Sequence, residues 1–272
     1  MSASERYLHG HHESVLRSHS WRTVENSAAY LVPYLTPGAD LLDVGSGPGT
    51  ITLDLARRLR PGRVVGVDAS PDVVAQATAL AADAEAANVS FEVGDAYGLD
   101  FPDASFDIVH AHQVLQHLAR PVHALREWRR VLKPGGILAV RDVVYRATVW
   151  APANPGLDRW LDAYLASARS TGGEPDAGAS LKAWAREAGF EGIECTASVW
   201  CFASDVEREW WGGSWADRVL KSSFAVQTIE AGAADLADLE GMAAGWASWR
   251  DDPDGWLAMT HGEVIARRPL DD

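Results

Sequence analysis

Short apolar runs alternate with amphipathic stretches through the first half of the chain. The apolar runs predict strands at residues 40–44, 63–67, 89–93, 106–111 and 137–141. Apolar side chains at helical spacing predict helices at 48–59, 71–86 and 121–132. Strands that alternate with helices in this way are typical of a doubly wound, mostly parallel α/β sheet. Such sheets bind ligands beyond the carboxyl ends of their strands.

The pattern changes on either side of this region. Upstream, apolar residues at helical spacing over 21–35 predict a helical extension, so we assign 1–35 to an N-terminal lid. Downstream, ten of the 12 tryptophans lie at residue 150 or beyond. We expect helices at 155–170 and 180–188, a strand at 191–202, a helical insertion at about 204–250 and a last strand at 257–267. The chain therefore divides into this extension, a ligand-binding core at 36–145, and a C-terminal part at 146–272 whose insertion forms a substrate lid.

The first predicted strand runs into a glycine-rich loop, Asp43-Val44-Gly45-Ser46-Gly47-Pro48-Gly49-Thr50. Glycine allows sharp turns and close approach of a ligand to the backbone. A helix that starts directly after the loop would point its free N–H groups at the ligand. These features predict a cofactor loop. The spacing is G-x-G-x-G, however, and Thr50 stands where the dinucleotide pattern G-x-G-x-x-G has its third glycine.

Acidic residues stand at the ends of the first three predicted strands, at Asp43, Asp68 and Asp95. A carboxylate at Asp43 would repel a pyrophosphate but would suit a cationic sulfonium ligand with a free ammonium group. The ribose diol of such a ligand fits an acceptor at Asp68, and its adenine amino group fits one at Asp95. A nicotinamide-dependent reductase stays an alternative, since it would also use Asp68 on a ribose.

In these motifs the chain resembles the class I S-adenosylmethionine-dependent methyltransferases, particularly those of ubiquinone/menaquinone and natural-product biosynthesis. The resemblance covers about residues 22–142. It is carried by Asp43-Val44-Gly45-Ser46-Gly47-Pro48-Gly49, Val67-Asp68, Gly94-Asp95-Ala96, Phe106-Asp107-Ile108-Val109 and Val131-Leu132-Lys133-Pro134-Gly135-Gly136. It implies a seven-stranded Rossmann-like sheet, S-adenosylmethionine as cofactor, and methyl transfer to an O, C or N atom of a small apolar or aromatic metabolite. A related enzyme that uses bound S-adenosylmethionine without methylating is a second alternative.

The resemblance also implies roles for individual residues. The cofactor would be bound by Asp43, Gly45, Ser46, Gly47, Gly49, Asp68, Ala69, Ser70, Asp95, Ala96, His112 and Gln113. His117 and His112 are candidates for a general base, which is needed only if the acceptor carries a proton of high pKa. Substrate contacts are expected from Tyr7, His11, His12 and Trp200. Tryptophans 210, 211 and 215 are typical of a core, although a flat substrate could stack on them.

Composition and charge narrow the class of protein to which the chain can belong. With 272 residues, 47% apolar residues and a net charge of −14, the chain is typical of a globular protein and unlike a nucleic-acid binder. No apolar run is long enough to span a membrane, and residues 1–21 contain no apolar signal segment, so we expect a cytoplasmic location. No metal site is predicted, because His110 and His112 have no third ligand nearby. Cys195 and Cys201 are expected to be buried thiols, and Asp107 to have a structural role. A homo-oligomer is left open.

Overall fold

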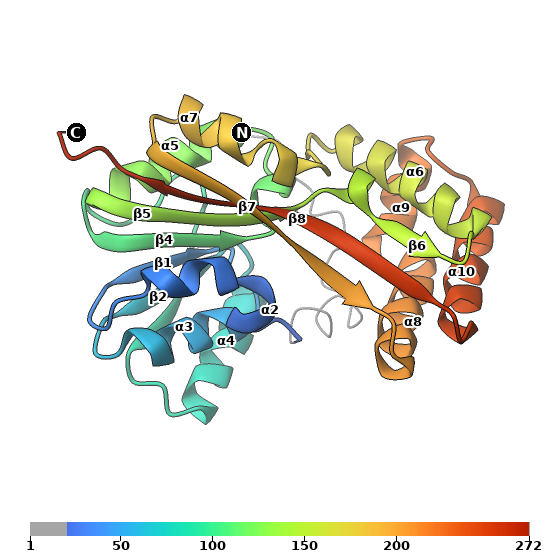
Figure 1. Ribbon diagram of the computed structural model, residues 1–272, viewed down its shortest axis with the longest axis horizontal. Coiled ribbons are helices and arrows are strands. Elements are labelled where there is room, and N and C mark those ends of the chain that lie inside the picture. The colour runs from blue at the N-terminus through green and yellow to red at the C-terminus, as the bar shows by residue number, and fades with distance from the viewer. Residues whose placement is uncertain (1–20, 272) are drawn as a thin grey trace.

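The computed structural model describes residues 21–271 (Figure 1). Within that range eight strands form one sheet in the order β3-β2-β1-β4-β5-β8-β6, and β7 pairs with β8. The strands β1 to β5 are parallel, whereas β8 runs antiparallel to β5, β6 and β7. Their bounds are β1 Leu41–Val44, β2 Val64–Asp68, β3 Val89–Val93, β4 Phe106–His112, β5 Leu132–Val143, β6 Val149–Ala151, β7 Glu191–Phe202 and β8 Trp256–Arg267. The predicted doubly wound sheet is confirmed, and only the short β6 was not expected.

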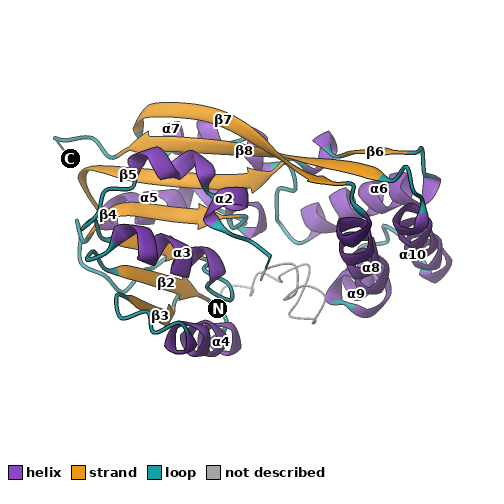
Figure 2. Cartoon of the chain, turned by 60° about the horizontal axis from the view of Figure 1, so that its bottom comes forward, coloured by secondary structure: helices purple, strands orange, loops and turns teal. Residues whose placement is uncertain are grey.

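Helices cover both faces of the sheet because successive side chains of a buried strand point to opposite sides. Leu41 of β1 packs in the cluster formed with the first helices, α2 (Val24–Ser27), η1 (Ala29–Tyr34) and α3 (Thr50–Leu59). Leu42 packs on the other face, against α5 (Pro121–Val131) and α7 (Leu181–Glu187). The helix α4 (Pro71–Asp83) lies at the β3 edge (Figure 2).

Four helices make up a distal helical layer beyond the carboxyl ends of the strands, on the right of Figure 1. They are α6 (Pro155–Ser170), α8 (Asp205–Lys221), α9 (Ser223–Glu230) and α10 (Leu236–Asp251). This layer has its own aromatic core, in which the Trp160 ring lies 4.7 Å from that of Trp215 and 4.8 Å from that of Trp246. The tryptophan-rich half of the sequence therefore builds a second core next to the sheet.

Within 21–35 the predicted helical extension is present as two short segments, α2 followed by η1, and Pro33 lies inside η1. The predicted buried state of Cys195 and Cys201 is wrong. Both thiols are exposed, because this face of β7 is open to solvent, as the half-exposed Val199 on the same face shows. Among the described residues, no helix is long and apolar enough to cross a membrane.

Candidate functional site

The glycine loop turns its backbone N–H groups toward the neighbouring strand. Gly45 (φ +69°) and Ser46 donate to the Val67 carbonyl at 2.7 and 3.0 Å, and Gly47 donates to Asp68 Oδ2 at 3.0 Å. A side chain at Gly45 would overlap Val114, which packs directly on the turn. Because the loop uses these three N–H groups internally, it does not present them to a diphosphate. The geometry argues against the nicotinamide alternative.

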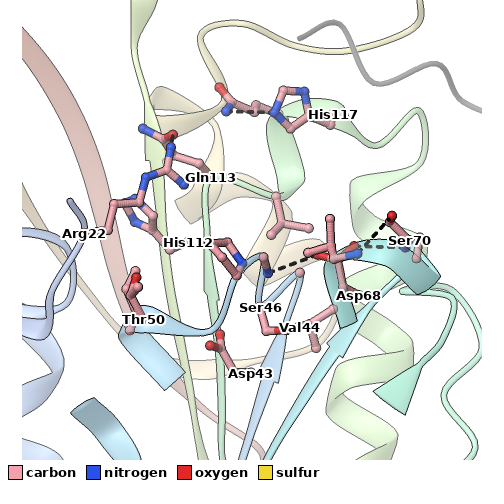
Figure 3. A pocket seen from close by; sticks show the side chains of 18 of the residues that line it. Arg22, Asp43, Val44, Ser46, Thr50, Asp68, Ser70, His112, Gln113 and His117 are labelled. Carbon is pink, nitrogen blue, oxygen red and sulfur yellow. Dashed lines mark hydrogen bonds between the residues drawn. The ribbon is translucent and has the colours of Figure 1, made fainter. Parts of the chain in front are cut away.

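Two carboxylates lie at the ends of β1 and β2 and line the same cavity (Figure 3). The buried Asp43 accepts a hydrogen bond from Thr52 Oγ1 at 2.6 Å and lies 2.7 Å from His110 Nδ1. Asp68 accepts from the N–H groups of Gly47 and Ser70, both at 3.0 Å. A carboxylate oxygen has more than one acceptor direction, so Asp68 can still accept from a ligand hydroxyl.

The cavity has a volume of about 590 Å³, within the range of ligand pockets. It starts at the glycine loop and continues beneath the distal helical layer. The predicted site residues that line it are Asp43, Gly45, Ser46, Gly47, Asp68, Ala69, Ser70, Ala96, His112, Gln113, His117 and Trp200. Twelve residues predicted from separate parts of the sequence thus meet at one cavity.

Two predicted cofactor residues do not line this cavity. Gly49 (φ +87°) is the residue before α3, and a side chain there would overlap Phe91. Asp95 is exposed and accepts from the Tyr97 N–H at 2.9 Å, although its neighbours Gly94 and Ala96 line the cavity. Tyr7, His11 and His12 lie outside the described residues.

Arg22, which no sequence pattern predicted, lines the cavity from just before α2. Its Nη2 donates to Gln113 Oε1 at 2.7 Å, and the Gln113 amide lies 2.8 Å from His261 Nε2 (Figure 3 shows the Arg22–Gln113 pair). Gln113 has a positive φ of +56°, which is uncommon outside glycine and marks a strained position. The Gln113 side chain lies between an arginine and a histidine from distant parts of the chain.

Both candidate general bases are neutral at physiological pH. Burial, reinforced by the nearby Arg22 charge, lowers the pKa of His117 to about 3. Burial also lowers the pKa of His112 well below its usual value, with further contributions from Arg22 and Arg141. Both ring nitrogens of His112 are buried and have no hydrogen-bond partner within residues 21–271, so they are available to a ligand.

Aromatic side chains form the opposite wall of the cavity. Trp200 donates its indole N–H to the Asn26 carbonyl at 2.6 Å, which ties β7 to α2, and its ring lies 5.6 Å from that of His112. Trp211 and Trp215, which the sequence left open between core and ligand contact, pack in the aromatic core and also line the cavity. Other lining residues that the sequence analysis did not single out are Gln116, Tyr145, Arg218 and Met259. Their positions depend on tertiary packing, and no local motif marks them.

Comparisons with known proteins agree with this geometry. Residues 35–197 match the family described as methyltransferase domain. An uncharacterized methyltransferase of Schizosaccharomyces pombe is 34% identical over 96% of each chain. Among solved structures, a [4+2]-cyclase is 27% identical with a TM-score of 0.55, covering 94% of this chain and 81% of its own. A phosphoethanolamine N-methyltransferase of Haemonchus contortus in complex with S-adenosylmethionine shares the fold at 20% identity, with a TM-score of 0.55 and coverage of 89% and 52%.

The family match covers more than half of the chain, and the yeast relative matches it nearly end to end. The parallel core order β3-β2-β1-β4-β5 and the antiparallel β8 agree with the fold of the structural neighbours. The chain belongs to the class I S-adenosylmethionine-dependent methyltransferases.

Proposed function

We propose that this methyltransferase acts on a flat, apolar or aromatic small molecule that lies against the tryptophans of the cavity. The observation that carries this proposal is the continuity of the cavity. One space runs from the glycine loop to a wall that contains Trp200, Trp211 and Trp215. Aromatic rings offer large rigid apolar surfaces on which a flat molecule can stack.

The residues at the loop end fit the charges of the donor. S-adenosylmethionine carries a ribose diol, an ammonium group and a carboxylate. We assign the ribose hydroxyls to Asp68, since its carboxylate is held at the cavity by two backbone N–H groups. We assign the ammonium group to the Asp43 region and the methionine carboxylate to Arg22, whose guanidinium is oriented by Gln113. The ammonium group and the carboxylate of the donor then each meet a protein group of opposite sign.

When bound, S-adenosylmethionine supplies a methyl carbon already activated by its sulfonium. The chain therefore has to align the acceptor with that carbon and exclude water. Trp211 and Trp215 on α8 line the cavity from the distal helical layer. Trp200 on β7 lines the part of the cavity in which the methyl acceptor would bind. His112 and His117, being neutral, can give or accept hydrogen bonds to the acceptor without carrying charge.

A substrate panel tests the proposal. Phenols, naphthols and aliphatic alcohols of matched size are incubated with S-adenosylmethionine, and S-adenosylhomocysteine and methylated product are quantified by mass spectrometry. We expect the aromatic compounds to be preferred. Trp211→Leu should raise the acceptor KM about tenfold, since ring contacts contribute about 0.5–1.5 kcal/mol beyond buried area. The matched control is Trp256→Leu, since Trp256 is partly exposed at the start of β8 and does not line the cavity. Preference for the aliphatic alcohols would contradict the proposal.

A second candidate follows from the likeness to the [4+2]-cyclase. A protein of this fold can carry out a ring closure, and the same aromatic cavity would suit a large folded substrate. The two candidates differ in their products, because only methyl transfer converts S-adenosylmethionine to S-adenosylhomocysteine stoichiometrically with product. A cytoplasmic location, the absence of a nucleic-acid partner and the oligomeric state stay predictions of the sequence.

A further inference from the structure

Three polar side chains form a row of hydrogen bonds that leads from the cavity into the sheet. Arg22 Nη2 donates to Gln113 Oε1 at 2.7 Å, and the Gln113 amide nitrogen lies 2.8 Å from His261 Nε2. At the other nitrogen of the ring, His261 Nδ1 lies 3.1 Å from the Met259 carbonyl oxygen. Arg22 and Gln113 line the cavity, whereas His261 on β8 is fully buried and, within residues 21–271, is not part of the cavity wall.

The two ends of this row fix the direction of every hydrogen bond in it. A backbone carbonyl can only accept, so the neutral His261 ring carries its proton on Nδ1 and accepts at Nε2. A guanidinium can only donate, so Gln113 turns its oxygen to Arg22 and its NH2 group to His261. Both ends therefore require the same orientation of the Gln113 amide. The reversed amide would set two groups of donors against each other at Arg22.

His261 has to be neutral for this row to hold, because a protonated ring would present a second N–H to the Gln113 NH2 group. Burial lowers the pKa of His261 well below its usual value, and the nearby Arg141 charge lowers it further. The ring centroid lies 4.4 Å from that of Trp200, and the ring is stacked with His112 at 6.3 Å. The surrounding fold therefore holds the imidazole in place and in the charge state that the row needs.

Arg22 is a side chain for which such support matters. It lies just before α2, and besides Gln113 it contacts the Trp200 ring, with its guanidinium carbon 5.6 Å from the ring centre (Figure 3 shows Arg22 and Gln113). An arginine side chain has many rotamers, and a ligand that has to order it binds more weakly. A guanidinium that is oriented before the cofactor arrives avoids this loss of affinity.

We propose that His261 is a positioning residue for cofactor binding, which sets the orientation of the Gln113 amide and, through it, the place of the Arg22 guanidinium at the cavity. The inference rests on the proposed function, in which Arg22 binds the methionine carboxylate of S-adenosylmethionine. His261 itself touches neither the cofactor nor the acceptor. Its contribution therefore concerns the amino-acid end of the cofactor and leaves the adenosine end unaffected.

Two ligands that differ in their amino-acid end test this inference by isothermal titration calorimetry. S-adenosylhomocysteine carries the amino acid, whereas 5′-methylthioadenosine has the same adenosine and a thioether without it. In His261→Phe the Gln113 NH2 group loses its acceptor. We expect the Kd for S-adenosylhomocysteine to rise about tenfold and the Kd for 5′-methylthioadenosine to stay within about twofold.

Two further substitutions of histidine separate the hydrogen bond from the shape of the ring. His261→Gln should restore most of the S-adenosylhomocysteine affinity, since its side-chain oxygen can take the place of Nε2 and accept from Gln113. His123→Phe is the matched control, because His123 is exposed on α5 and does not line the cavity. It should leave the affinity for both ligands unchanged.

A double substitution shows whether the effect passes through Arg22. Arg22→Met alone should weaken S-adenosylhomocysteine binding and leave 5′-methylthioadenosine binding unchanged. In the Arg22→Met protein, His261→Phe should cause no further loss, because two residues that act through one contact are not additive. Should His261→Phe fail to fold, nitrogen-15 NMR of the labelled wild-type protein still decides. We expect a neutral His261 ring with its proton on Nδ1.

The inference is overturned by an unchanged S-adenosylhomocysteine affinity in folded His261→Phe, by an equal loss for both ligands, or by a further loss in the Arg22→Met protein. A His261→Gln protein as weak as His261→Phe, or a His261 ring that carries its proton on Nε2, would also overturn it. Failure of the proposed function looks different. In that case S-adenosylhomocysteine does not bind the wild-type protein, or Arg22→Met alone does not change the preference for S-adenosylhomocysteine over 5′-methylthioadenosine.

Discussion

Replacement of Asp68 by asparagine should weaken S-adenosylhomocysteine binding strongly with little change in shape. The carboxylate accepts from the Gly47 and Ser70 N–H groups at 3.0 Å each and lines the cavity. Hydrogen bonds to a charged group contribute about 1.5–3 kcal/mol each. Two ribose hydroxyls on Asp68 would therefore contribute roughly 3–6 kcal/mol, of which the amide oxygen of asparagine keeps a part. We expect a loss of about 2–4 kcal/mol, or a ~30–1,000-fold higher Kd.

Isothermal titration calorimetry with S-adenosylhomocysteine measures this loss of affinity. The same substitution at another hydrogen-bonded aspartate is the control that separates an effect on binding from an effect on stability. Asp107 is likewise hydrogen-bonded, accepting from the Asp40 N–H and from Lys133 Nζ at 2.8 Å each, but it lies near the amino end of β4 and does not line the cavity. Asp107→Asn should lower the free energy of unfolding by about 1 kcal/mol and leave the Kd within about twofold. An unchanged Kd in a folded Asp68→Asn protein would refute the assignment of the ribose to this residue.

Three further predictions concern stability and the Arg22 contact. Burial raises the pKa of Asp142 to about 7, so the folded protein keeps a proton that the unfolded chain releases near pH 4. The free energy of unfolding should therefore fall as pH rises from 4 to 7, by up to ~1.4 kcal/mol per unit. Urea titrations should find a flatter profile for Asp142→Asn, and equal slopes would contradict this pKa. Glycine tolerates a positive φ, so in Gln113→Gly thermal melting should show a stability within about 1 kcal/mol of wild type. Calorimetry should show an S-adenosylhomocysteine affinity about tenfold lower, because Arg22 loses its hydrogen-bond acceptor. Trp200→Leu should cost about 3 kcal/mol or more in urea unfolding, since it empties a buried ring site and leaves the Asn26 carbonyl without its donor, while Trp200→Phe should cost less.

The glycine-loop end of the site could be predicted because its residues are placed by local rules. Neighbouring parallel strands have their carboxyl ends side by side, so acids at the carboxyl ends of β1 and β2 must lie near each other, as Asp43 and Asp68 do. The structural role expected for Asp107 is confirmed by its hydrogen bond to the start of β1. Asp95 follows the same strand-end rule, yet its side chain turns to the Tyr97 N–H, which a strand assignment cannot foresee.

The part of the cavity that the distal helical layer and Arg22 line could not be predicted in this way, because its residues come together only through tertiary packing. Arg22 precedes α2 and meets Gln113, which is 91 positions further along the chain. Trp211 and Arg218 lie on α8 at positions where helical periodicity indicates only that they face a core. Periodicity identifies the buried face of a helix but not whether a second core or a cavity lies opposite.

The assignment of His112 and His117 as general bases shows most clearly what residue identity leaves out. That interpretation took histidine at its ordinary pKa, near neutrality. In the fold both rings share a buried wall with Arg22, and burial and positive charge each disfavour a second positive charge. Burial is the larger of the two causes, and neither can be foreseen from the identity of a histidine in the sequence. Both rings are therefore weak bases at neutral pH, and they can serve the site as neutral hydrogen-bonding groups rather than as proton acceptors.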